Sequence, residues 1–190
     1  MSARRSAALI LLAFALAACR RESDLPKLFA VPDATLVNEA GKPFNLAANK
    51  GKVTVYNFIF TNCTGTCPMM TANMRKLTKK IDGDAPVRFV SISVDPARDT
   101  PAVLAEYASK VRNDERWMFL TGEARDIVEL SVKGFKLAAS ADVQPGAEPL
   151  LHSSKFAVAD RTGTIREYYG GTDGDVAEHV SGTVEELLRE

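Results

Sequence analysis

Apolar and polar positions along the chain predict strands and helices in alternation. Strands are expected where apolar and β-branched residues run together, at 53–60, 87–94, 117–120, 155–160 and 165–169. Apolar spacing and helix-start signals place helices at 68–81, 101–110, 123–132 and 173–188. Two shorter strands, at 35–38 and 43–46, flank a polar turn and predict a hairpin.

The order of these elements predicts an α/β fold. Two successive strand–helix units indicate parallel neighbouring strands, because helical crossovers are the short route between such strands. The late hairpin adds antiparallel strands, so we expect a thioredoxin-like fold with an N-terminal hairpin extension and a C-terminal helix. Functional groups of open α/β sheets lie beyond the carboxyl ends of strands. Cys63 and Asp95 both follow strand ends and should therefore be neighbours.

Two cysteines stand four positions apart where the first long strand meets a helix start. The strand Val53–Phe60 delivers Cys63 to a loop, and Pro68 suits a first helical turn, so Cys67 should lie at or beside the N-cap. The N-terminus of a helix stabilises negative charge and thereby favours thiolates. Thiolates are both nucleophiles and soft metal ligands, so the pair is the main candidate for chemistry.

The N-terminus has the pattern of an export signal. Arg4 and Arg5 precede an apolar stretch, Ala7–Ala18, that is shorter than the roughly 20 residues of a membrane span. The ending Leu16–Cys19 resembles the bacterial lipobox, which implies cleavage before Cys19 and attachment of lipid to that residue. Attachment of more than one acyl chain gives stable membrane anchoring. An ordinary secretory signal, with Cys19 incidental, is the alternative.

These features divide the chain into a signal peptide at 1–18, a lipidated tether at 19–27 and one folded domain at 28–190. We therefore expect an exported, membrane-anchored lipoprotein that faces the periplasm or the extracytoplasmic space. The 24 basic and 24 acidic side chains balance, and loss of Arg4 and Arg5 leaves a net charge of −2. No basic face or charge run stands out, which argues against nucleic acid as a partner.

Three separated motifs resemble the Sco/SenC family of copper-binding proteins, which help to assemble cytochrome c oxidase. They are Cys63-x3-Cys67-Pro68, the Asp95-Pro-Ala-Arg-Asp-Thr-Pro101 segment and His152-Ser153 before a late strand. The resemblance covers roughly Leu28–Tyr169. The Thr64–Thr66 triplet departs from the family, because it lacks the proline or acidic residue often found between the cysteines. A lipobox also replaces the membrane helix of many members.

The resemblance implies a ligand set and a partner. Cys63, Cys67 and His152 would bind one copper ion, and Asp95 would belong to a loop near the metal. The implied partner is the cytochrome c oxidase subunit that carries the copper A site. Other periplasmic copper chaperones or thioredoxin-like reductases are further implied partners.

The chemistry of this ligand set agrees with copper. Two thiolates select Cu(I) over hard cations, and imidazole suits both oxidation states, so the set can hold Cu(I) and Cu(II). Binding requires deprotonated thiols and a neutral imidazole, and affinity should therefore fall as the pH drops.

Other interpretations stay open beside a copper-binding protein. The two thiols could act as a thiol–disulfide oxidoreductase, although such enzymes usually have two residues, not three, between their cysteines. A structural disulfide or a peroxiredoxin-like peroxidase are weaker alternatives, since the peroxidase signature is absent apart from Thr61. His179 is expected to be a solvated helix residue, and Met69, Met70 and Met74 are expected to pack in the core.

Overall fold

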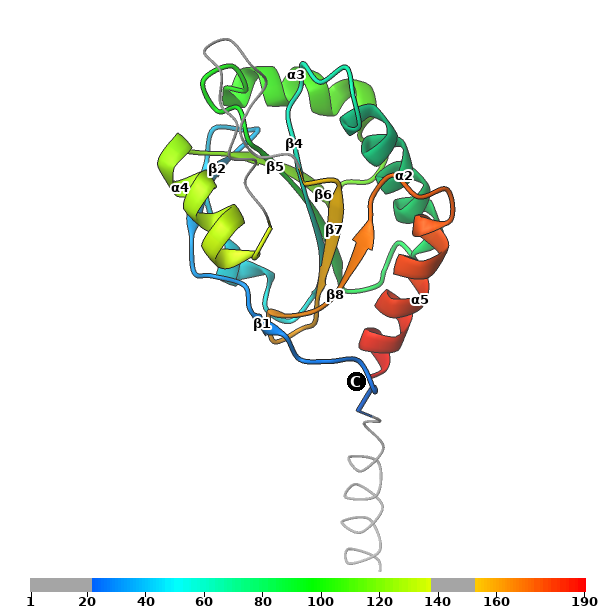
Figure 1. Ribbon diagram of the computed structural model, residues 1–190. Helices are drawn as coiled ribbons and strands as arrows, with labels where there is room; N and C mark the ends of the chain where they lie inside the picture. The colour runs from blue at the N-terminus through cyan, green and yellow to red at the C-terminus, as the bar shows by residue number, and fades with distance from the viewer. Residues whose placement is uncertain (1–21, 138–152) are drawn as a thin grey trace, which may run out of the picture.

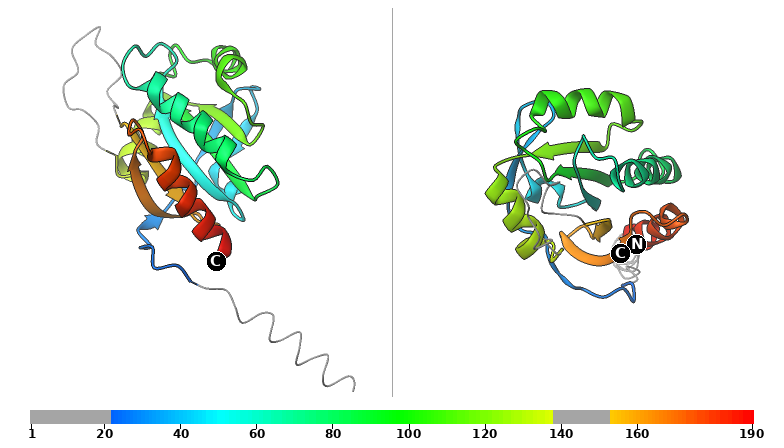
Figure 2. Two further views of the ribbon diagram at one scale, coloured as in Figure 1. Left: turned by 90° about the vertical axis from the view of Figure 1, so that its right-hand side faces the viewer. Right: turned by 45° about the horizontal axis from the view of Figure 1, so that its top comes forward.

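A computed structural model describes residues 22–137 and 153–190, and these residues form a mixed sheet with helices on both faces (Figures 1 and 2). The strand order in the sheet is β1-β8-β7-β4-β5-β6-β2-β3. Its centre consists of three parallel strands, β4 (Val53–Ile59), β5 (Val87–Ser93) and β6 (Trp117–Thr121). The expected thioredoxin-like α/β fold is confirmed.

Antiparallel strands extend the sheet on both sides of this centre. The late hairpin, β7 (Lys155–Ala159) and β8 (Thr164–Gly170), joins β4 through β7. The early hairpin, β2 (Thr35–Asn38) and β3 (Pro43–Asn45), joins β6 through β2. Both hairpins were expected from the sequence. The two-residue strand β1 (Phe29–Ala30), which pairs with β8, was not, because two residues are too short to show a periodic pattern.

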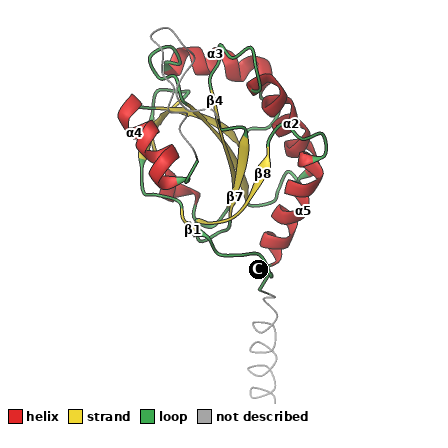
Figure 3. Cartoon of the chain, viewed as in Figure 1, coloured by secondary structure: helices red, strands yellow, loops and turns green. Residues whose placement is uncertain are grey.

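Within the described residues, α2 (Cys67–Lys80), α3 (Pro101–Val111) and α5 (Val176–Arg189) cover one face of the sheet and α4 (Ala124–Glu129) covers the other (Figure 3). The Tyr107 and Thr71 hydroxyl groups, 2.9 Å apart, join α3 to α2. On the other face, the ring of Phe135 packs against Tyr56 and Phe58 of β4, with centroids 5.0 and 5.3 Å apart.

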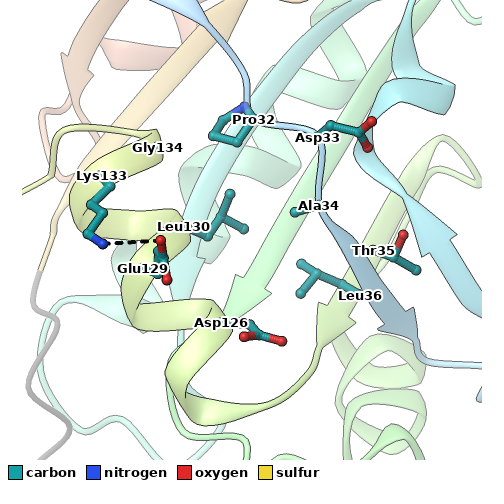
Figure 4. A pocket seen from close by; sticks show the side chains of 10 residues that line it. All are labelled: Pro32, Asp33, Ala34, Thr35, Leu36, Asp126, Glu129, Leu130, Lys133 and Gly134. Carbon is teal, nitrogen blue, oxygen red and sulfur yellow. Dashed lines mark hydrogen bonds and ion pairs between the residues drawn. The ribbon is translucent and has the colours of Figure 1, made fainter.

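The helix on that second face ends differently from the prediction. The expected helix at 123–132 is a short α-helix, α4 (Ala124–Glu129), followed by a π-helical turn, η2 (Leu130–Gly134). A side chain at Gly134 has no room, because a Cβ there would lie 2.5 Å from Cγ of Pro32. Figure 4 shows Pro32 directly beside Gly134. The glycine therefore lets this turn lie against the segment that leads into β2.

Replacing Gly134 by alanine should destabilise the domain by about 1–3 kcal/mol, the usual cost of overpacking. Gly182 is the matched control, because a Cβ at this position in α5 meets nothing within 4 Å. Gly182→Ala should stabilise the domain by about 0.5–1 kcal/mol, since glycine inside a helix costs about that much relative to alanine. Urea unfolding of both variants measures the two changes, and an unchanged midpoint for Gly134→Ala would contradict the packing argument.

Candidate metal centre

The two cysteines lie where β4 ends and α2 begins, at the carboxyl edge of the parallel strands (Figure 1). Cys67 is the first residue of α2 and is 6% exposed. Cys63 is half-buried and packs against the core from the preceding loop. Both are in the thiol form. The loop therefore presents one accessible and one sheltered sulfur.

The three residues between the cysteines form the outer part of this loop. Thr64, Gly65 and Thr66 are all exposed, whereas the two flanking cysteines turn towards the protein. A Cβ at Gly65 would lie 3.9 Å from Sγ of Cys63, an ordinary van der Waals contact. Gly65 thus lies beside the Cys63 sulfur, and the middle of the loop faces solvent.

The start of α2 favours negative charge at Cys67. The helix is 14 residues long, and the dipoles of its peptide groups add up to a positive potential at its N-terminus. Thr66 is the N-cap residue and makes no side-chain capping hydrogen bond, and Pro68 has no N–H group. This confirms the expected position of Cys67 beside the N-cap, where a thiolate is favoured.

Asp99 ties the two loops at this edge together. Its carboxyl group is 1% exposed and accepts hydrogen bonds from the backbone N–H of Thr61 (3.0 Å) and from the Thr61 hydroxyl (2.5 Å). It also accepts one from the hydroxyl of Ser93, at 2.5 Å. Thr61 follows β4 two residues before Cys63, and Ser93 ends β5. One buried carboxyl group therefore sets the position of the chain that leads into the cysteine loop.

The sequence motif at 95–101 contains Asp99 but does not indicate this role. Nothing in the sequence distinguishes a buried aspartate from an exposed one there. The side chain becomes central only because β4 and β5 are parallel neighbours, which brings Thr61 and Ser93 to the same carboxyl group.

Asp95 lies at the start of this same loop. Its backbone N–H donates to the Ser93 hydroxyl at 3.1 Å, and its carbonyl oxygen accepts hydrogen bonds from the N–H groups of Arg98 and Asp99. Its carboxylate pairs with the Arg98 guanidinium at 2.9 Å. Asp95 thus lies just after β5, close to the hydrogen bonds by which Asp99 holds the cysteine loop. Its part in metal binding stays a prediction.

Tyr107 of α3 belongs to the electrostatic surroundings of the cysteines. Burial raises the pKa of its phenol, and the hydrogen bond with Thr71 offsets part of that increase. The negative charge that Cys67, Cys63 and Asp99 can carry raises the pKa further. The first turns of α2, the cysteine loop and α3 therefore form one connected region.

The described residues supply only part of the expected ligand set. Within 22–137 and 153–190, no group of three His, Cys, Asp or Glu side chains is placed to hold a metal ion. His152 and the lipidation residue Cys19 lie outside the described residues. His179 is exposed in α5, as expected. The chemistry of the two thiols fits a soft metal such as copper, and a third ligand would have to come from outside the described residues.

The methionines near the site have different surroundings. Met70 and Met74 are 1% and 0% exposed in the core, as expected. Met69 is 53% exposed, so the prediction that it packs in the core is wrong. It lies two positions after Cys67, and residues two apart on a helix do not share a face.

A cavity of about 410 Å³ lies away from this edge, between the segment before β2 and the α4–η2 turn (Figure 4). Its lining includes Leu36 and Leu130, and Lys133 at its rim pairs with Glu129 at 3.1 Å. Neither cysteine lines this cavity.

No helix in the described part of the chain has the length and apolar character needed to cross a membrane.

The SCO1/SenC family model matches residues 26–189 of this chain. A SCO1/SenC family lipoprotein from Bacillus anthracis has a similar crystal structure, with a TM-score of 0.76 and 33% identity. The match covers 88% of this chain and 99% of that one. These similarities span both loops of the candidate site.

Two further solved structures are similar to this chain. BsSco, a member of the Sco family of cytochrome c oxidase assembly proteins with a disulfide switch, has a TM-score of 0.75 and 32% identity, over 88% of this chain and 97% of that one. Yeast Sco1 with copper bound has a TM-score of 0.67 and 25% identity, over 84% of this chain and 90% of that one.

Proposed function

Because this chain belongs to the SCO1/SenC family, we propose that it is a membrane-anchored extracytoplasmic protein that delivers copper to a cytochrome c oxidase. Sco proteins bind copper and take part in assembly of that oxidase. In this proposal the copper site consists of Cys63, Cys67 and His152. A lipid on Cys19 holds the protein outside the cytoplasm. The protein's cargo goes to the oxidase subunit that carries the copper A site.

The observation that carries this proposal is the pair of thiols at the start of α2. Cys67 is sheltered at the positive end of a helix, and Cys63 is half-buried in a loop that Asp99 fixes through Thr61. Two thiolates on one short loop make a chelating soft site, which suits Cu(I). A neutral imidazole from His152 completes a ligand set that suits Cu(II) as well.

Delivery then proceeds by exchange of ligands. Reduced Cys63 and Cys67 take up the ion, and His152 closes the set. The acceptor protein docks at the carboxyl edge of the sheet, where its own ligands first contact the ion beside the more accessible Cys63. Cys63, Cys67 and His152 are then replaced one after another, so the ion is never released to water.

Replacing His152 by alanine should lower the affinity for Cu(II) by more than about 100-fold, because even residues that only orient a ligand contribute 10–100-fold. The measurement is copper content and absorption spectra of reduced protein without residues 1–18, loaded with Cu(I) or Cu(II). Intense thiolate-to-Cu(II) charge-transfer bands are expected in the unchanged protein and are expected to be lost in the variant.

His179→Ala is the matched control for this experiment. It removes the only other histidine of the chain, which is exposed on α5, and should leave the spectra unchanged. Wild-type bands in His152→Ala, or no copper retained by the unchanged protein, would overturn the proposed ligand set.

A second candidate function is thiol–disulfide exchange, favoured by the unequal exposure of the two thiols. The accessible Cys63 thiolate would attack a partner disulfide and release one partner thiol. Cys67 would then attack the mixed disulfide, leaving Cys63–Cys67 oxidised and the partner with two thiols. Reduction of insulin tests this activity. Activity that persists in His152→Ala while copper binding is lost would assign the thiols to both functions.

A further inference from the structure

A buried arginine joins the start of the domain to its end. Arg166, in β8, is 0% exposed. Its guanidinium donates hydrogen bonds to five groups, which we call with it the Arg166 cluster. They are the carbonyl oxygens of Leu25 (2.7 Å) and Pro26 (2.9 Å), the hydroxyl of Ser23 (3.0 Å) and the carboxylates of Asp160 (3.1 Å) and Glu190 (2.9 Å).

Three of these five acceptors belong to the tether that precedes β1. Ser23 is held a second time, because its backbone N–H donates to Glu190 at 2.9 Å and its hydroxyl bonds the same carboxylate. Burial by itself would raise the pKa of Glu190, but hydrogen bonds from Arg166 and Ser23 lower it to about 2. Glu190 therefore carries its negative charge at neutral pH, and a charged group without its partner there would be costly.

The cluster lies at the opposite end of the domain from the cysteine loop. Asp160 precedes the β7–β8 turn, and the N–H of Gly51, just before β4, donates to Arg161 in that turn at 2.8 Å. From there β4 runs for seven residues, about 20 Å at 3.3 Å per residue, before the loop with Cys63 begins. Figures 1 and 2 show the C-terminus at one end and the β4–α2 loop at the other.

We propose that the Arg166 cluster is the membrane-facing end of the anchored protein, and that it holds the cysteine loop on the side away from the lipid surface. The inference rests on the proposed lipid anchor at Cys19. Cys19 is four residues before Ser23, and four residues span at most about 14 Å. The lipid surface must therefore lie close to the cluster.

Without the cluster the same anchor would hold the domain less firmly. The next backbone hydrogen bond from this segment to the sheet is donated by the N–H of Leu28 to the carbonyl oxygen of Ile165, at 2.9 Å, and Leu25 packs against the core just before it. Nine residues separate Cys19 from Leu28, which allows a reach of about 32 Å. A tether of that length would let the domain tilt until either end met the membrane. The Arg166 cluster thus shortens the hydrogen-bonded tether from about 32 Å to about 14 Å.

This orientation also limits where the partner protein that exchanges copper with the cysteine loop can carry its metal site. With β4 upright on the lipid surface, the partner's soft ligands would stand about 20 Å above that surface, because β4 separates the cluster from the loop by about that distance. A site close to the headgroups would not reach Cys63. The partner is therefore a domain that projects from the membrane and presents its metal site at that height.

The test uses the full lipidated chain in lipid vesicles that carry an energy acceptor on their headgroups. In a chain with Cys63→Ser and Cys67→Ser, a fluorophore is placed by Thr64→Cys in the loop or by Arg189→Cys beside the cluster. Both positions are exposed. We expect several-fold stronger quenching at residue 189 than at residue 64. Equal quenching at the two positions would overturn the orientation.

Arg166→Met should reduce that difference, because it releases the tether. The milder pair Ser23→Ala with Glu190→Gln, which keeps the arginine, should reduce it as well if Arg166→Met does not fold. An undiminished difference in a folded variant would show that the cluster does not set the orientation.

Co-flotation with vesicles separates this inference from the anchor on which it rests. Cys19→Ala should stay in solution, and the unchanged chain should float. A chain that does not float would overturn the anchor together with this inference, and copper binding by the domain would still be measured independently. If the chain floats but quenching is equal at residues 64 and 189, the anchor stands and only the proposed orientation is overturned.

Discussion

Cys63→Ser and Cys67→Ser are each expected to lower the affinity for Cu(I) by well over about 100-fold, since orienting residues alone contribute 10–100-fold. A hydroxyl is a hard donor that does not ionise at neutral pH, so each change removes both softness and chelation. Competition with a Cu(I) chelator of known affinity measures the loss. In cells that have no second copper chaperone for the oxidase, either change should also abolish oxidase assembly.

Thr64→Ser is the matched control in the same loop, because Thr64 is exposed and lies directly beside Cys63. Copper affinity and oxidase assembly should be unchanged in this variant. Normal oxidase activity with either cysteine replaced would contradict delivery through this pair. Loss of assembly with copper affinity intact would instead point to the thiol–disulfide exchange function.

Asp99→Ala is expected to destabilise the domain by about 3 kcal/mol, because it leaves buried donors of Thr61 and Ser93 without their acceptor. It should also lower copper affinity by about 10–100-fold, the range for residues that orient a metal ligand. The second effect follows from geometry, since Thr61 positions the chain two residues before Cys63. Urea unfolding and copper competition measure the two effects separately.

Asp99→Asn separates the position of the loop from the charge of the side chain. Asparagine keeps one oxygen acceptor of the same shape, so most of the stability and the absorption spectrum of the copper-loaded protein should return. A shifted charge-transfer band in Asp99→Ala that is restored in Asp99→Asn identifies Asp99 as a positioning residue. Wild-type copper affinity in a destabilised but folded Asp99→Ala would limit its role to stability.

Much of the fold and the centre of the site could be predicted from the sequence. Strands such as Val53–Ile59 are runs rich in apolar and β-branched residues. Helix starts such as Thr100-Pro101 are local signals, and Thr100 accepts a cap hydrogen bond from the N–H of Val103. The position of Cys67 at a helix start follows from its neighbour Pro68. All of these are signalled by residues close together in the chain, which a sequence pattern records directly.

The remaining features depend on contacts between distant residues. The sequence did not place the early hairpin beside β6, and it did not show that Asp99 would be buried between the ends of β4 and β5. Arg166 likewise meets Pro26, 140 positions earlier, and Glu190 only when the domain has closed. No local pattern records which distant backbone will supply a partner to a charged side chain.

The sequence by itself determined that two thiols would stand at the start of a helix beyond a parallel strand. Only the tertiary structure decided which carboxyl group holds their loop and which end of the domain holds the tether. The physical reason is that a buried charged group needs several partners at once, and packing of the whole chain brings those partners together.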